Sequence, residues 1–249
     1  MKKPYADNSP ERVLSDLLVI ATVFVILVAS AKTVSATSGS YYAYAMDNQD
    51  QYLYRSVKGK QTTLNFTVTH GSSDENDGIA SWVDVFHYAN NGEWMQVGFA
   101  KGWSPINNTD GYHGVVWLDT PHYYVDRQIG GAYNCTYFDP PATIGENHEY
   151  WVYLYSWGST TIMAAFIDGD CKLAESGYYS SSCDAKGATE SHNTRDQMNS
   201  YFFAMKAGTQ WNNPVAFHDD AYGEDNPPYS IFPHPPALTD TWITRGKGS

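Results

Sequence analysis

Charged residues are scarce in this chain, and basic residues are the scarcest. Only 17% of the 249 residues are Asp, Glu, Lys or Arg, and 15 Lys and Arg against 27 Asp and Glu give a formal net charge of −12. The basic residues are scattered and form no patch in the sequence. A protein that binds nucleic acid must neutralise phosphates, so nucleic acid is not an expected partner.

Local motifs of hydrolytic and metal chemistry are also absent. The chain has no H-E-x-x-H, no G-x-S-x-G and no C-x-x-C pattern, so the sequence predicts no zinc site and no nucleophile elbow. We therefore predict no catalytic residue and no required cofactor, and consider an enzyme the less favoured interpretation. Calcium is the one metal kept open, with Asp74, Asp77, Asp219 and Asp220 as candidate ligands in two acidic turns.

Cysteine is rare, with three residues in the chain. Cys171 and Cys183 flank a short loop and are the predicted disulfide, an arrangement that suits an oxidising compartment. Cys135 then remains as a buried free thiol, or as the true partner of one of the other two. The spacing alone leaves both pairings open.

One long apolar run is present, at the N-terminus. Lys2, Lys3 and Arg12 precede an apolar stretch over 17–31, and small residues follow up to Ala36. This pattern predicts an export signal cleaved after Ala36 or Ala31, with an uncleaved membrane anchor as the alternative. As a helix, the run would be about 22 Å long, short of the hydrocarbon core of a bilayer. Either interpretation places the rest of the chain outside the cytoplasm, at the cell surface or in the extracellular space.

What the chain has in abundance is aromatic residues, 15% of the total with 20 Tyr and 8 Trp. The segment over 145–169 places several of them in an alternating pattern. Its residues 149–157 alternate, with Trp151, Tyr153, Tyr155 and Trp157 on one face and mixed apolar residues on the other. Turns at 158–159 and at 168–169 bound a second run over 162–167. We predict a β-hairpin with one buried face and one aromatic face.

Other segments also have the composition of strands. We predict strands in the ranges 41–44, 52–57, 62–70, 79–88, 93–102, 115–118, 122–128, 133–138 and 200–206, with a surface loop over 103–114 and a short helix or polar loop over 191–198. Asn91-Gly92 is a strong hairpin signal. The tail from residue 211 holds six of the twelve prolines, so we expect it to pack on the domain or trail from it.

These predictions define an all-β protein, a two-sheet jelly-roll β-sandwich with an N-terminal signal or anchor helix and an irregular Pro-rich tail. The predicted boundaries are 1–36 for the leader, 37–210 for the sandwich and 211–249 for the C-terminal extension.

The pattern G-x-x-H-x-Y-x-V followed by F-I-D-G, over 145–169, resembles a hairpin of the concanavalin A-like and laminin G-like sandwiches. The resemblance covers about 82–169 and implies a jelly roll whose concave face often binds glycans. Related glycosidases carry E-x-D-x-x-E on one strand, which this chain lacks. Glutamic peptidases with related sandwiches need a Glu pair or a Glu/Gln pair on strands. Most of the seven glutamates after the leader are expected in turns, and Glu149 and Glu190 remain as possible members of a pair.

The favoured function is therefore non-catalytic, lectin-like carbohydrate binding through an aromatic sheet face, because Trp and Tyr rings stack on sugars. The partner would be an extracellular polysaccharide or a cell-surface glycan, and the membrane would be contacted only through an uncleaved leader. One alternative is a structural or adhesive assembly protein; another is a glycoside hydrolase or glutamic-type peptidase. The predicted ligand-binding residues are Trp151, Tyr153, Tyr155, Trp157, Trp103, Trp117 and Tyr123.

Overall fold

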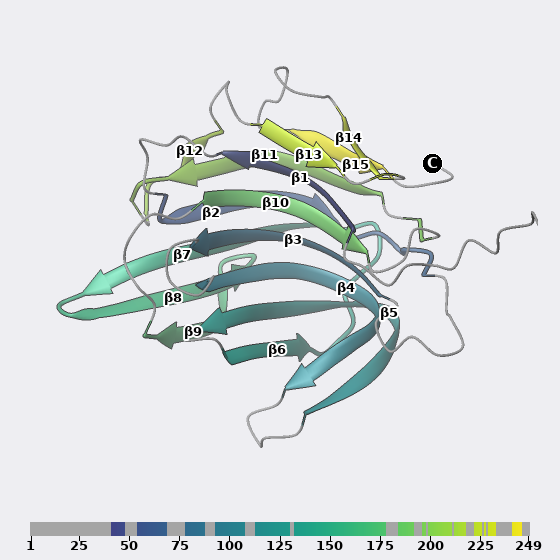
Figure 1. Cartoon of the computed structure of the whole chain (residues 1–249), viewed down its shortest axis with the longest axis horizontal. Coiled ribbons are helices and arrows are strands. Elements are labelled where there is room, and N and C mark those ends of the chain that lie inside the picture. The colour runs from purple at the N-terminus through teal and green to yellow at the C-terminus, as the bar shows by residue number, and fades with distance from the viewer. Residues whose placement is uncertain are drawn as a thin grey trace, which may run out of the picture. The chain divides into compact units, whose positions relative to one another are not determined.

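Two antiparallel β-sheets form the folded part of the chain in the computed structural model (Figure 1). The structure describes residues 41–47, 54–68, 78–87, 93–107, 113–129, 132–177, 184–191, 196–197, 199–210, 212–217, 222–225, 227, 229–232 and 241–245. Among these residues there is no helix, and none therefore that is long and apolar enough to cross a membrane. The predicted leader lies outside the described residues.

The first sheet has seven strands and runs from top to bottom in Figure 1. In spatial order its strands are β13 (Tyr222–Asp225), β1 (Tyr41–Asp47), β10 (Asp184–Ser191), β3 (Gly78–His87), β4 (Glu93–Asn107), β5 (His113–Ile129) and β6 (Ala132–Phe138).

The second sheet has eight strands. In spatial order they are β14 (Ser230–Phe232), β15 (Trp242–Arg245), β11 (Ser200–Gly208), β2 (Ser56–Thr62), β7 (Asn147–Trp157), β8 (Thr160–Ile167) and β9 (Asp170–Ser176), and β12 (Val215–Ala216) pairs with β11 off this path.

The main core joins the inward faces of both sheets. On β7, Tyr150, Val152 and Leu154 are buried in it, while the residues between them face outward. On β3 and β4 the same alternation buries Val83 and Val97, which are directly opposite each other in the ladder. Because side chains alternate along a strand, one inward row fixes which residues must occupy the other face of each sheet.

The hairpin predicted over 145–169 is confirmed. β7 and β8 pair from Tyr150–Ile167 to Trp157–Thr160, and β8 turns into β9 at Asp168 and Gly169, both with positive φ. A two-residue turn with positive φ at both positions matches the twist of the flanking strands, and Asp-Gly is well suited to it.

Several predicted boundaries are wrong. The range 63–66 is not a strand, and the predicted loop over 103–114 instead contributes residues of β4 and β5, which pair from Asn107–His113 onward. The two short strands predicted over 115–118 and 122–128 are one strand, β5. A register shift between Ala100 and Gly102 lets this long hairpin bend.

The structure also contains strands that were not predicted. β9 occupies part of the region expected to be a cysteine-flanked loop, and β10 follows that region. β12, β13, β14 and β15 come from the proline-rich tail. The tail strands sit at or beside a sheet edge, where proline is tolerated in the neighbouring segments.

Candidate active site

The first sheet carries a second buried cluster on the face that points away from the main core. Its buried members are Trp82, Ala100, Tyr124, Cys135 and Ala188. They come from five neighbouring strands, β10, β3, β4, β5 and β6, and the register aligns Ala188 with Trp82 and Tyr124 with Tyr137. We call this the outer face of the first sheet.

Polar side chains lie in the row beside this cluster. Gln96 is directly opposite Asp126 in the β4–β5 ladder, and the two residues are only 8% and 6% exposed. Gln96 Nε2 donates to Tyr124 Oη at 3.2 Å and to Asp126 Oδ2 at 3.4 Å. The amide is thus held between a phenol and a carboxyl group in a nearly dry environment.

Asp126 is held by two further hydrogen bonds. Tyr133 Oη donates to Oδ2 at 2.8 Å, and the backbone N–H of Arg127 donates to Oδ1 at 2.9 Å. Burial raises the pKa of Asp126 well above its usual value, and although these hydrogen bonds oppose the shift, the charge of Glu190 adds to it. A carboxyl group with a raised pKa keeps its proton at pH values where an exposed aspartate has lost it.

Glu190 is the third member of the group. It lies on β10, two residues beyond Ala188 and therefore on the same face. Burial is the main reason that the pKa of Tyr124 is raised, and the charges of Asp126 and then Glu190 raise it further. The carboxylate of Glu190 is thus within electrostatic reach of the phenol and carboxyl that hold Gln96.

Trp82 adds an unusual donor to this face. Its indole Nε1 is buried and has no hydrogen-bond partner within the described part of the chain, although a buried N–H normally has one. Lys186 Nζ lies 5.9 Å from the centroid of the Trp82 ring. A bound group with a hydrogen-bond acceptor would satisfy the indole.

Together these residues provide the elements of general acid–base chemistry. A carboxylate can take a proton from water, a protonated carboxyl can return one, and a fixed amide N–H can stabilise an oxyanion. Gln96, Tyr124 and Asp126 were not identified from the sequence. The available signal was the alternation of Trp94, Gln96 and Gly98, which places an amide on a strand face otherwise made of apolar and small residues.

Glu190 was named from the sequence, but the structure does not form the pair with Glu149 that the sequence left open. Glu149 lies on β7 in the second sheet, where its Oε1 is 2.8 Å from Lys58 Nζ. The expectation that most glutamates lie in turns is also wrong, since five of the seven belong to strands: Glu93, Glu149, Glu175, Glu190 and Glu224.

The predicted aromatic face of β7 does exist, on the outward side of the second sheet. The Trp151 and Tyr153 ring centroids are 5.0 Å apart, and Tyr153 stacks on Phe166 of β8 at 5.1 Å with an interplanar angle of 23°. Tyr155 is half-buried on the same face, and the side chain of Trp157 lies outside the described part.

The remaining predicted ligand residues do not join this face, because they belong to the first sheet. Trp103 and Trp117 are opposite each other in the β4–β5 hairpin, and the Trp117 indole donates to Asp119. Tyr123 packs between the sheets, with its Oη 2.7 Å from His148 Nε2. Tyr123 is thus a structural contact of β5 with β7.

The other predicted sites rest largely on residues outside the described ranges. Asp74, Asp77, Asp219 and Asp220 lie there, and within the described ranges no group of three His, Cys, Asp or Glu side chains could hold a metal ion. Cys171 is exposed on β9, and Cys135 is buried. Cys183 is outside the described residues, so its pairing with Cys171 stays a prediction.

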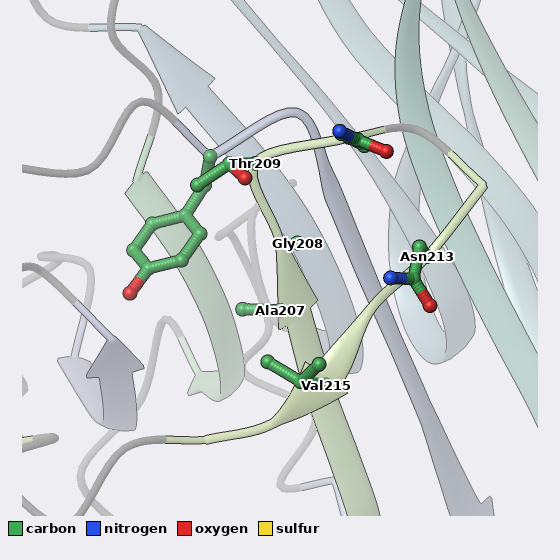
Figure 2. Close-up of a pocket in the computed structure, with 7 residues that line it drawn as sticks. Ala207, Gly208, Thr209, Asn213 and Val215 are labelled. Atoms are coloured by element: carbon green, nitrogen blue, oxygen red, sulfur yellow. The ribbon is translucent and has the colours of Figure 1, made fainter.

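A shallow pocket of about 210 Å³ lies elsewhere, at the turn that joins β11 to β12 (Figure 2). Thr209, Asn213 and Val215 form much of its wall, and Figure 2 shows their side chains around the end of β11. The described residues that line it include no carboxylate, imidazole or thiol. We therefore take the outer face of the first sheet, and not this pocket, as the candidate active site.

Comparisons with known proteins show a similarity of fold. The sequence matches no protein-family model and no curated protein. Among solved structures, a scytalido-glutamic peptidase with a peptide-based transition state analog is similar with a TM-score of 0.51 and 11% identity, over 85% of this chain and 100% of the other. A scytalido-glutamic peptidase with a transition state analog inhibitor gives 0.49 and 13% over the same shares. The kappa-carrageenase zobellia_236 from Zobellia galactanivorans gives 0.29 and 8%, over 84% and 77%.

Proposed function

We propose that the protein is a hydrolase of the glutamic-peptidase kind, which cleaves peptide bonds on the outer face of the first sheet. The observation that carries the proposal is the buried Gln96 amide, hydrogen-bonded to Tyr124 and Asp126 on a face that Glu190 shares. The fold is similar to that of a glutamic peptidase, a likeness that supports the choice of reaction without assigning residues.

Each member of the group has a role in the proposed reaction. Glu190 takes a proton from a water molecule as its oxygen attacks the peptide carbonyl carbon. Gln96 Nε2 gives up its longer hydrogen bond, the one to Asp126 at 3.4 Å, and donates that N–H to the resulting oxyanion. Tyr124 and Asp126 are positioning residues, because their hydrogen bonds orient the amide before the substrate arrives. The proton then passes to the departing amine.

Two features favour this proposal over the non-catalytic lectin predicted from the sequence. Gln96 and Asp126 are buried, and the pKa of the Asp126 carboxyl is strongly shifted. Shifted pKa values are concentrated at functional sites. The expected location is outside the cytoplasm, as the leader sequence predicts.

The decisive experiment is cleavage of an unfolded protein substrate by the purified protein across pH 3 to 7, with peptide products identified by mass spectrometry. We expect activity at acidic pH, and we expect Glu190→Gln and Gln96→Ala each to lower kcat by about 100-fold or more, the usual effect of removing a general base or an oxyanion donor. Glu149→Gln is the matched control, since it removes a carboxylate from the other sheet.

Two results would overturn the proposal. One is a folded wild-type protein that cleaves no peptide at any pH in this range. The other is a Glu190→Gln variant as active as Glu149→Gln. Release of reducing sugar from a polysaccharide, lost in Glu190→Gln, would replace the peptidase by a glycoside hydrolase.

A further inference from the structure

The outward side of the second sheet carries a group of lysines that the sequence does not reveal. Lys58 and Lys60 lie on β2, two residues apart and hence on one face, and Lys206 lies on β11 directly opposite Lys58. Lys60 and Lys206 are exposed, and Lys58 is half-buried. In a chain with a net charge of −12, this is a local excess of positive charge.

The positive charge of this group is only partly balanced. Glu149 is directly opposite Lys60 in the β2–β7 ladder but forms its ion pair with Lys58, at 2.8 Å, and no carboxylate of the described residues forms an ion pair with Lys60 or Lys206. Like charges directly opposite each other on a sheet are unfavourable, so an anionic group placed between these lysines would be stabilised. At physiological ionic strength, charges more than about 8 Å apart are largely screened. A ligand at this face therefore interacts more strongly with the local positive charge than with the net negative charge of the whole chain.

Aromatic side chains flank the lysines on one side. Lys58 is directly opposite Trp151 of β7, and its Nζ lies 5.0 Å from the centroid of the Trp151 ring. Trp151 in turn contacts Tyr153 and Phe166, with centroids 5.0 Å and 5.6 Å away. These half-buried rings form a band next to the cations.

A second aromatic band lies on the other side of the lysines. Tyr201 and Phe203 of β11 have ring centroids 5.5 Å apart. The register continues this band outward, because Tyr201 is opposite Ile243 and Ile243 is opposite Phe232. Tyr201 and Phe232 are 41% and 51% exposed, unusually high values for large apolar side chains. Lys58 and Lys60 on β2 therefore lie between two aromatic bands on one sheet face, and Lys206 lies farther along β11, the strand that carries the second band.

We propose that this face binds an anionic polysaccharide. Sugar rings would stack on the aromatic bands, and carboxylate or sulfate groups of the polymer would pair with Lys60 and Lys206. The side chains of a sheet face form a broad, nearly flat surface, which an extended polymer can follow. Membrane binding instead requires an element that buries its apolar side chains below the lipid headgroups. The site is on the opposite sheet from Gln96 and Glu190, and it does not depend on the proposed peptidase activity.

The test is binding of the full-length protein to polygalacturonate at pH 7 by isothermal titration calorimetry, with neutral dextran as the uncharged comparison. We expect binding to polygalacturonate alone, weakened as salt is added, and reduced about tenfold or more in the double variant Lys60→Gln/Lys206→Gln. Tyr201→Ala should reduce it as well. Lys172→Gln, a lysine of β9 paired with Asp170 at 3.9 Å, is the control with the same change of charge and should leave binding unchanged.

Circular dichroism of each variant checks that the fold is retained. The same titrations, repeated with other anionic ligands, distinguish a polysaccharide from other occupants of this face. Equal affinity in Lys60→Gln/Lys206→Gln and Lys172→Gln would overturn the proposal, as would no binding to polygalacturonate. Binding of polyglutamate with equal affinity would show that the face recognises negative charge alone. Binding only to anionic phospholipid vesicles would show that the face binds membranes. Either result would overturn the proposal of a polysaccharide ligand.

Discussion

Single residues decide how closely the strands next to the candidate site can approach. A Cβ on Gly98 would lie 1.9 Å from the carbonyl oxygen of Ser81, and the backbone of β3 cannot move away without breaking its ladder to β4. We expect Gly98→Ala to lower the free energy of unfolding by about 3 kcal/mol, the upper range for overpacking. Urea denaturation would measure it.

Gly59→Ala provides the comparison. Its added methyl group would meet Sδ of Met205, also at 1.9 Å, but this atom belongs to a flexible side chain that can rotate aside. The loss for Gly59→Ala should therefore be clearly smaller. A Gly98→Ala variant as stable as Gly59→Ala would mean that β3 and β4 are not held in this register.

At the scale of elements, an ion pair connects the two sheets near the site. Arg127 of β5 donates from Nε to Glu175 Oε2 at 2.6 Å and from Nη2 to Oε1 at 2.5 Å, so it binds β9 through two parallel hydrogen bonds. The guanidinium is largely buried, and Glu175 is partly exposed. Because Arg127 follows Asp126 in the chain, this bridge also fixes the segment that carries the shifted carboxyl.

Glu175→Gln should therefore destabilise the protein. It leaves a buried guanidinium without its counter-charge, and since Glu175 is partly exposed we expect a loss of about 2 kcal/mol, less than for a fully buried pair. Asp170→Asn removes the surface pair with Lys172, where the acid is 84% exposed, and should change stability by less than about 0.5 kcal/mol. Equal effects in thermal unfolding would show that the bridge between sheets contributes nothing.

The elements that sequence predicted well are those with a local signal. The hairpin of β7 and β8 was predicted because alternation and an Asp-Gly turn are both local, whereas β10 was missed because Lys186, Gly187 and Ala188 are poor strand formers. β10 is a strand because β1 and β3 pair with it on both sides, a long-range effect. The site was missed for the same reason, since Gln96 and Glu190 share one sheet face only because of the strand order β10, β3, β4.

At the scale of the whole molecule, two buried or bridged carboxyls give stability opposite dependences on pH. Partial burial alone would raise the pKa of Asp168, but hydrogen bonds from His148 and from the backbone N–H of Glu149 outweigh it and lower the pKa. Asp168 therefore stabilises the fold above the ordinary aspartate pKa of about 3.9, and this contribution is lost as the pH falls through its lowered value.

Asp126 acts in the other direction. Burial raises its pKa, so the folded state binds a proton more tightly than the unfolded chain does. Its contribution is complete below the ordinary value of about 3.9 and is lost as the pH rises through the raised value. These two groups together predict greatest stability in mildly acidic solution, the condition in which the proposed hydrolase would work.

The free energy of unfolding, measured by urea titration at a series of pH values, tests this account. We expect a maximum in mildly acidic solution, with Asp126→Asn removing part of the decline at higher pH and Asp168→Asn removing part of the decline at lower pH. Each variant should leave the decline on the other side of the maximum unchanged, because the two carboxyls lie on different sheets and do not share hydrogen-bond partners. If Asp126→Asn ran parallel to the wild type as pH rises, the pKa of Asp126 would not be raised by burial, and the carboxyl that positions Gln96 would be ionised in mildly acidic solution.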